Sequence, residues 1–170
     1  GAFIVEEAKS NSGVFITHAV LGTPVDMGIT DANNMGAAMA PSAAFTLRTF
    51  FEDTGTSPTD YDLILTGDLG YEGTKILRDL LKKENGIDLV DRHNDCGLLI
   101  YDTERQDVHA GGSGCGCSAV VLAGEIFGKL SRGELKNVLF AATGALMSTT
   151  SVQQGEPIVG ITHLVRLEKR

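Results

Sequence analysis

The residues best suited to chemistry lie in one glycine-rich segment, residues 109–119, which reads His-Ala-Gly-Gly-Ser-Gly-Cys-Gly-Cys-Ser-Ala. Glycine lets the backbone approach a ligand or another helix with no side chain between them. An apolar helical pattern starts directly after the segment, so unpaired N–H groups at the helix start would point at whatever lies above them. The segment is therefore the first candidate for a functional site.

Cys115 and Cys117 of this segment admit two interpretations. At a helix start the thiolate form is favoured, and a thiolate could contact a ligand or act as a nucleophile or an acid/base group. Alternatively, both residues are small and allow a buried helix to pack closely, as free cysteines commonly do. We favour packing. A zinc site is disfavoured, because no second cysteine pair accompanies them.

The remaining polar candidates are histidines and a mixed polar stretch. Residues 93–96, His-Asn-Asp-Cys, could line a pocket or form a simple turn. His18 and His163 fall within predicted strands, and we expect them to be structural.

Composition excludes several classes of function. The 170 residues are enough for one domain with its own core, and the net charge of −8 disfavours nucleic-acid binding. No apolar run reaches the roughly 18 residues of a membrane span, and no signal-peptide pattern is present. The odd number of cysteines, three, indicates a reducing compartment.

The hydrophobic pattern predicts strands alternating with helices, which is typical of an α/β sheet with helices on its faces. The helix around residues 41–54 is expected to have Pro41 in its first turn and to end at Gly55. Ligands of such sheets bind at loops after the strands, here residues 66–70, 109–118 and 143–148. The predicted strands are 13–21, 63–66, 98–101, 138–142 and 158–167; the other predicted helices are 73–84 and 117–131; the predicted loops include 22–36, 67–70, 102–107 and 143–145.

Several unusual strings resemble the stage V sporulation protein AD family, and the resemblance runs through essentially the whole chain. The strings are residues 27–31 (MGITD), 34–41 (NMGAAMAP), 61–69 (YDLILTGDL), 93–98 (HNDCGL), 111–115 (GGSGC) and 143–148 (TGALMS).

The resemblance implies a thiolase-like fold of two similar halves, each a βαβαβαββ unit with a mixed five-stranded sheet and helices on its faces. Residues 1–170 correspond to one unit, the C-terminal half, and the start at Gly1 without Met is consistent with a piece of a longer protein. We expect the half to fold stably only with its N-terminal half or as a dimer, because its packing faces would otherwise be exposed.

The family resemblance also implies a function. It predicts a non-catalytic subunit of the SpoVA channel complex that binds dipicolinic acid and aids calcium dipicolinate uptake during sporulation. The implied partners are the other SpoVA subunits, the N-terminal half and a second copy in a homodimer, with no cofactor and no metal of its own. The implied location is the forespore or spore, peripheral at the inner membrane. The alternatives are an acyl-transferring enzyme of the thiolase or ketosynthase kind, and a structural scaffold for the channel's membrane subunits.

In active relatives the nucleophilic cysteine lies in the N-terminal half, and the C-terminal half supplies a histidine with an asparagine or a second cysteine. In this sequence Asp68 stands where the resemblance places the histidine, and Gly112–Gly114 stand where it places the second catalytic residue. The acyl-transfer machinery is therefore expected to be dismantled. His109 lacks the proline of a thiolase Gly-His-Pro motif and is not expected to be catalytic. Asp68 could instead cap the turn that follows it.

The predicted ligand site therefore combines backbone N–H groups and hydroxyls of the glycine-rich segment with Asp68. No arginine lies in these loops, since Arg92 and Arg105 are outside them, and a dianion with no cationic partner binds weakly. Either calcium accompanies the ligand, or the other half supplies the main contacts and this half provides only a wall of the pocket; from the sequence alone we favour the latter. The predicted ligand-binding residues are Asp68, Gly112, Ser113, Gly114, Cys115 and Ser118.

Overall fold

The computed structural model of the chain describes residues 2–89 and 91–170, so Gly1 lies outside the described residues. Five strands form one mixed sheet in the order β1-β5-β4-β2-β3. Strand β4 pairs antiparallel with β5 and parallel with β2, and β2 pairs parallel with β3. The predicted mixed five-stranded α/β sheet is confirmed. The strands are β1 (Val14–Val20), β2 (Leu63–Thr66), β3 (His93–Asp95), β4 (Asn137–Leu146) and β5 (Val159–Lys169).

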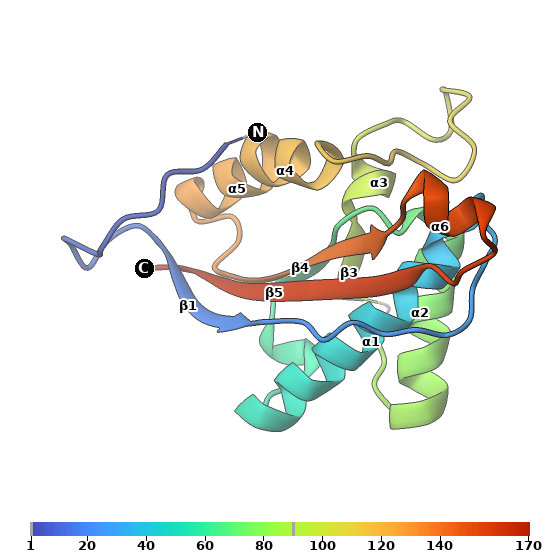
Figure 1. The fold of residues 1–170 in the computed structure, drawn as a ribbon. Helices are drawn as coiled ribbons and strands as arrows, with labels where there is room; N and C mark the ends of the chain where they lie inside the picture. Colours follow the sequence, from blue (N-terminus) through green and yellow to red (C-terminus); the bar gives the residue numbers. More distant parts are fainter. Residues whose placement is uncertain (1, 90) are drawn as a thin grey trace.

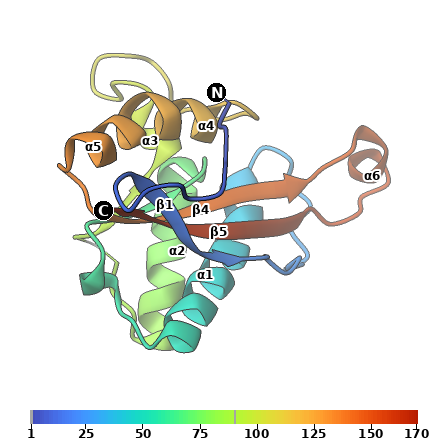
Figure 2. The ribbon, with the colours of Figure 1, turned by 90° about the vertical axis from the view of Figure 1, so that its left-hand side faces the viewer.

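Helices cover both faces of this sheet and give three layers (Figures 1 and 2). Helices α1 (Met35–Thr54) and α2 (Gly70–Asn85) lie side by side on one face. The other face carries α3 (Cys96–Leu99), α4 (Cys117–Val121) and α5 (Phe127–Arg132), with a π-helical turn (η2, Leu122–Ile126) between the last two. The remaining elements are a 3-10 turn (η1, Pro58–Asp60) and α6 (Thr149–Gln153), which lies in the connection from β4 to β5.

Each helical layer buries its own apolar cluster against the sheet. Under α1 and α2 the cluster includes Leu47, Phe50 and Leu77, while Leu65 and Ile126 belong to the cluster on the opposite face. Burial of apolar surface on this scale is the main stabilising contribution in a domain of this size. The sheet is therefore a fixed platform, and the ends of β2, β3 and β4 hold the loops that carry the candidate site.

Helix α1 starts earlier than the sequence predicts. Asn34 caps it by accepting a hydrogen bond from the backbone N–H of Ala37, so Pro41 lies inside the helix and not in its first turn. The early start brings Gly36 against Gly73 of α2, where an added Cβ would lie only 2.8 Å from the facing Cα. The helix ends as predicted, with Gly55 in the left-handed conformation.

Two local predictions are wrong. Residues 98–101 do not form a strand: α3 occupies Cys96–Leu99, and the strand is the preceding polar stretch, His93–Asp95. The predicted loop at 143–145 belongs instead to β4, which stays paired with β5 as far as Leu146 and Val159. The order of the major strands and helices is otherwise as predicted. Within the described residues, no helix has both the length and the apolar character needed to cross a membrane.

Candidate functional site

The carboxylate of Asp68 joins the turn after β2 to the glycine-rich segment. Asp68 Oδ2 accepts hydrogen bonds from Ser113 Oγ at 3.0 Å and from the backbone N–H of Gly114 at 3.1 Å. Thr143 of β4 contacts both the backbone and the carboxylate of Asp68. Its hydroxyl accepts a hydrogen bond from the Asp68 N–H at 3.1 Å and lies 3.4 Å from Asp68 Oδ1. Three of the loops or strand ends expected to carry a site therefore meet at one half-buried carboxylate.

The alternative that Asp68 caps its own turn is wrong, because Asp95 does this instead. Asp95 Oδ2 accepts from the N–H of Leu69 and Oδ1 from the N–H of Gly70, both at 3.0 Å. Oδ1 also accepts from the N–H of Gly97 at 2.9 Å, which caps α3. One fully buried carboxylate thus holds the starts of two helices, α2 and α3. Asp95 is the main residue that sequence reasoning missed.

Asp95 ends a directional chain of buried hydrogen bonds. Arginine has donors only, so Arg78 Nε must donate to His93 Nδ1 at 3.1 Å. The ring proton of His93 is then on Nε2, which donates to the Thr66 hydroxyl at 3.0 Å. Thr66 in turn donates to Asp95 Oδ2 at 2.6 Å. The stretch 93–96 is therefore neither a simple turn nor an open pocket wall: it is the short strand β3, buried at His93 and Asp95, and the first residue of α3.

Burial determines the charge states along this chain. It lowers the pKa of His93 to about 3, with the nearby positive charge of Arg78 acting in the same direction. Burial raises the pKa of Asp95, while the hydrogen bonds from Thr66 and from the N–H groups of the two helix starts oppose that rise. The imidazole is consequently neutral at physiological pH and works as a structural linker.

Half of the glycine-rich segment is packed and half is open. The backbone N–H of Gly112 donates to the Gly97 carbonyl at 2.7 Å, and an added Cβ on Gly112 would lie 2.3 Å from the Ile100 side chain. By contrast, an added Cβ at Gly114 or Gly116 would meet nothing within 4 Å. The exposed stretch 113–116 is the part that could contact a ligand, and Gly112 acts through packing.

The three thiols differ sharply in access. Cys96 and Cys117 are buried, whereas Cys115 is exposed in the open half of the segment. Burial, followed by the negative charge of Asp68, raises the pKa of Cys117 to about 11, and burial also raises the pKa of Cys96. For Cys117 the burial agrees with the favoured packing interpretation, and the thiolate alternative is wrong, because desolvation outweighs the effect of the short helix.

The histidines lie away from these thiols. His109 is almost fully exposed, with its Nε2 atom 3.9 Å from a carboxylate oxygen of Asp107. His163 accepts the backbone N–H of Gly22 at 3.0 Å, and the His18 ring lies edge-on to Phe50, so both have the expected structural roles. Within the described part of the chain, no cysteine sulfur lies within hydrogen-bonding distance of a histidine nitrogen.

The predicted site residues are thus only partly brought together. Asp68, Ser113 and Gly114 are joined directly, and Cys115 follows them on the open stretch. The Ser118 side chain, in the first turn of α4, has no hydrogen bond to another described residue. Groups of three or more potential metal ligands are not found among the described residues.

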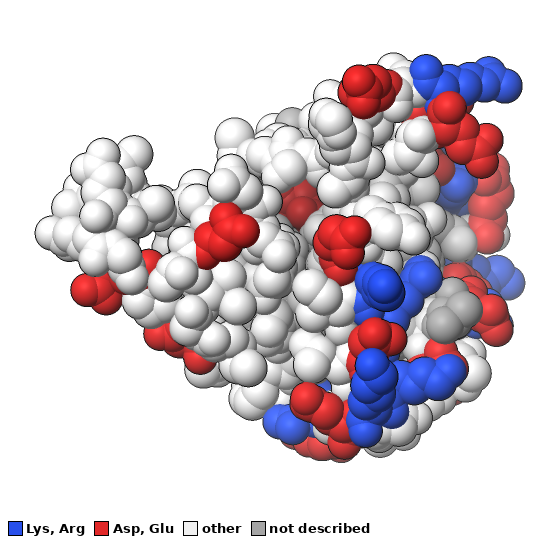
Figure 3. All heavy atoms as spheres, turned by 90° about the vertical axis from the view of Figure 1, so that its right-hand side faces the viewer, with Lys and Arg blue, Asp and Glu red and all other residues white. Residues whose placement is uncertain are grey.

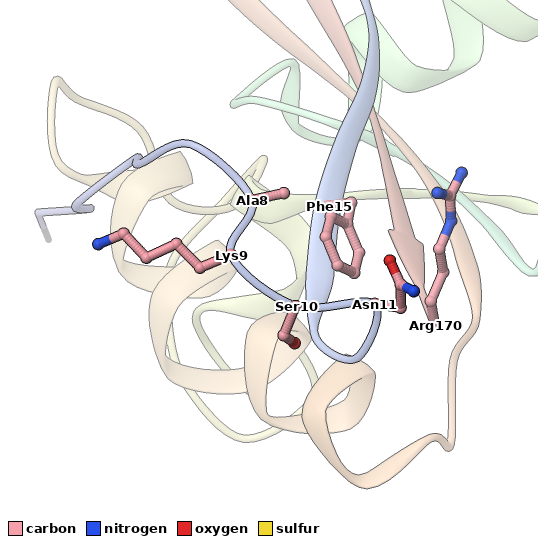
Figure 4. A pocket seen from close by; sticks show the side chains of 6 residues that line it. All are labelled: Ala8, Lys9, Ser10, Asn11, Phe15 and Arg170. Carbon is pink, nitrogen blue, oxygen red and sulfur yellow. The ribbon is translucent and has the colours of Figure 1, made fainter.

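A separate hollow of about 320 Å³ lies where the N-terminal segment passes the end of the chain (Figure 4). The Arg170 guanidinium lies over the Phe15 ring at 5.4 Å and pairs with Glu168 at 2.8 Å, while Lys9 points away and pairs with Glu6. Because both cations already have carboxylate partners, this hollow has little attraction for an anion.

Comparison with known proteins places the chain in a family. Residues 1–168 match the family described as Stage V sporulation protein AD (SpoVAD). The chain is 48% identical over 169 residues to Stage V sporulation protein AD of Bacillus subtilis (strain 168). The alignment covers 99% of this chain and 49% of that relative, so the chain spans about half the length of the curated relative it matches. With the family match extending over nearly every residue, the chain belongs to the stage V sporulation protein AD family, whose name assigns it to sporulation.

Proposed function

We propose that the chain is a non-catalytic, ligand-binding part of a sporulation protein and that its ligand is calcium dipicolinate. The observation that carries the proposal is the Asp68 junction, where a carboxylate fixes Ser113 and Gly114 beside an open stretch of backbone. In the wider proposal the protein belongs to the SpoVA channel complex, peripheral at the spore inner membrane. Its partners there are the other SpoVA subunits, the N-terminal thiolase-like half and a second copy.

Charge supports calcium dipicolinate over the free dianion. An ionised Asp68 repels a bare dicarboxylate, and its hydrogen bonds to Ser113 and Gly114 hold that negative charge at the edge of the open stretch. A calcium ion accompanying the ligand removes the repulsion, because carboxylate oxygens are its preferred partners. The N–H groups of residues 113, 115 and 116 on this exposed stretch would then contact ligand oxygens, while the N–H of Gly114 donates to Asp68.

The arrangement of thiols and histidines argues against acyl transfer. A nucleophilic cysteine needs a nearby base or a lowered pKa, and the pKa of Cys117 is raised to about 11. The His93 ring nitrogens are engaged with Arg78 and Thr66. Asp68, which occupies the position of a catalytic histidine in the thiolase-like resemblance, accepts hydrogen bonds and would not stabilise an oxyanion.

The scaffold alternative draws on a different feature, the exposed end of the β4–β5 hairpin. Leu146 and Met147 are 60% and 50% exposed there, next to α6. Such residues are typical of a protein contact. This contact is compatible with ligand binding at Asp68, so the two functions can be separated by mutation.

The test is calorimetric titration of pyridine-2,6-dicarboxylate, with and without calcium, into this chain and into the full-length protein that contains it. We expect binding with calcium and at least about tenfold weaker binding without it. Asp68→Asn should remove the calcium dependence, and Asp62→Asn, at the other end of β2, is the matched control. Binding to full-length protein that is unchanged by Asp68→Asn would place the ligand in the other half. No binding to either protein would contradict the proposal.

A further inference from the structure

A second hollow, of about 350 Å³, lies along α2. One stripe of the helix, at spacings of three and four residues, supplies most of its wall, and Leu98 of α3 also lines it. On the face drawn in Figure 3, Lys and Arg gather at one end, while the protruding end opposite shows Asp and Glu but no Lys or Arg. The residues that line the hollow are Tyr71, Thr74, Lys75, Arg78, Asp79, Lys82, Asp88 and Leu98.

The hollow carries positive charge that the protein itself does not neutralise. Lys82 pairs with Asp88 at 2.7 Å, and the Asp79 carboxylate pairs with Lys83 at 3.3 Å. Lys75 and Arg78 have no carboxylate within 4 Å among the described residues. Arg78 donates two hydrogen bonds to the neutral His93, one to the ring Nδ1 atom and one to the backbone carbonyl. The chain as a whole has a net charge of −8, so two cations without a carboxylate partner in one hollow stand out from the rest of the surface. Their positive charge favours the binding of an anionic group there.

Thr74 gives an independent sign of a ligand. Thr74 is one of the residues that line the hollow, and it is only 5% exposed. Its hydroxyl has no hydrogen-bond partner among the described residues. A buried unsatisfied hydroxyl costs free energy, so native proteins rarely retain one without a partner to complete it. Thr74 lies on the same stripe as the two cations, and because its hydroxyl oxygen is buried, it would complete the coordination of an anion they hold by turning toward the hollow.

The apolar residues that line the hollow indicate what the ligand carries besides its anionic group. The Tyr71 ring is largely exposed, and its backbone is fixed by a hydrogen bond from its N–H to the Ala110 carbonyl at 2.7 Å. Leu98 of α3 lines the same hollow and is half-buried. A ring and an aliphatic side chain beside two cations suit an anion that carries a flat apolar body.

We propose that this hollow binds a small organic monoanion: its anionic group on Lys75, Arg78 and the Thr74 hydroxyl, its apolar body between Tyr71 and Leu98. The hollow is built from α2, Asp88 in the connection that follows it, and α3, and it shares no residue with the Asp68 junction. The proposal therefore stands independently of the function proposed above.

The test uses benzoate as the probe in a titration of the full-length protein that contains this chain, followed by calorimetry and by backbone NMR shifts. We expect saturable binding, with the largest shifts in α2, and binding about tenfold weaker for neutral benzyl alcohol. Inorganic phosphate, which lacks the apolar body, should also bind more weakly. Absence of saturation by benzoate, or equal affinity for benzyl alcohol, would overturn the proposal.

Two variants with a matched control locate the site. Lys75→Gln should weaken benzoate binding by about five- to tenfold, whereas Lys83→Gln, on the same helix but outside the hollow, should leave it unchanged. Thr74→Val should weaken benzoate binding by about threefold and at the same time raise the melting temperature, because it removes the unsatisfied hydroxyl. Unchanged affinity in both hollow variants would overturn the proposal, even if benzoate binds elsewhere.

Discussion

His93 is held neutral by its surroundings, and this gives the fold a dependence on pH. The ring accepts a hydrogen bond from Arg78 and donates one to Thr66, and burial lowers its pKa to about 3. In the unfolded chain the pKa of histidine is about 6.5. Below pH 6.5 the unfolded state therefore takes up a proton that the folded state does not, so stability falls as the pH falls.

We expect the free energy of unfolding to drop by about 2 kcal/mol between pH 7.5 and pH 5 on account of His93. Denaturant titrations across this range measure the drop. His93→Gln should be less stable at pH 7.5 but should lose most of the slope, whereas His109→Gln, at an exposed position, should retain it. Burial raises the pKa of Asp95, but Asp95 is present in all three proteins and cancels in the comparison. If the unfolding free energy of His93→Gln depended on pH as steeply as that of the wild type, the conclusion that His93 is neutral in the folded protein would be contradicted.

Thiol reactivity should follow exposure rather than position in the glycine-rich segment. Cys115 is exposed, while burial raises the pKa of Cys117 to about 11. We expect a thiol reagent at pH 8 to label one cysteine rapidly, and labelling of Cys96 and Cys117 to require unfolding. Mass spectrometry of digested, partly labelled protein identifies the site, and Cys115→Ser should abolish the rapid phase. Fast labelling of Cys117 would instead support an activated thiolate and revive the acyl-transfer alternative.

At the scale of elements, Asp95 connects the sheet to two helices. Its two oxygens accept from the N–H groups that start α2 and α3, and from the Thr66 hydroxyl. In Asp95→Asn an amide NH₂ would replace one acceptor and face these donors. We expect a loss of about 2–4 kcal/mol in unfolding free energy, against less than about 1 kcal/mol for Asp68→Asn at its half-buried site. Equal losses in the two variants would show that Asp95 is not the principal anchor.

The crossing of α1 and α2 depends on two facing glycines. An added Cβ at Gly73 would lie 2.8 Å from the Gly36 Cα, on backbone that cannot move aside cheaply. We expect Gly73→Ala to cost about 1–3 kcal/mol, because the helices must separate. Gly124→Ala is the control: its Cβ would meet nothing within 4 Å, and it should stabilise the helix by about 0.5–1 kcal/mol. Thermal melts of both variants give the comparison, and a stabilised Gly73→Ala would refute close packing.

The sequence predicts most elements well because their patterns are strong. The apolar positions of α2 and the continuous apolar run at the start of β4 leave little ambiguity. The run Leu98–Tyr101 was misread as a strand because periodicity cannot separate a short buried strand from a short helix. A signal was nevertheless present: an aspartate directly before an apolar run, as at Asp95, is typical of a helix N-cap.

The candidate site was only partly predictable, for a different reason. Asp68 and Ser113 are 45 positions apart, and the hydrogen bond between them depends on how the loops fold back over the sheet. Their residue types suggested a site, but the partition of the glycine-rich segment into a packed half and an open half depends on Gly97 and Ile100. Those contacts come from α3, the helix that the pattern did not resolve.

At the scale of the whole molecule, one end of the sheet exposes apolar side chains. The segment after β1 follows β5 through backbone hydrogen bonds between Val25 and Gly160, which brings it beside the β4–β5 hairpin. Leu146 and Met147 lie at the end of that hairpin, just before α6, and both side chains are exposed. The net charge of −8 keeps separate copies apart by long-range repulsion, so any association must come from a specific patch.

We expect the 170-residue chain alone to self-associate at micromolar concentration, because this apolar end has no cover within the chain. Sedimentation velocity should show species larger than the monomer. Replacing Leu146 and Met147 together by serine should shift the chain toward monomer without lowering its melting temperature, since both side chains are exposed. Tyr101→Ser, at an exposed aromatic residue on α3's side of the sheet, should leave association unchanged. A wild-type chain that sediments as a monomer and unfolds cooperatively would show that half the length of the relative is self-sufficient, and the patch would then be free to contact a different protein.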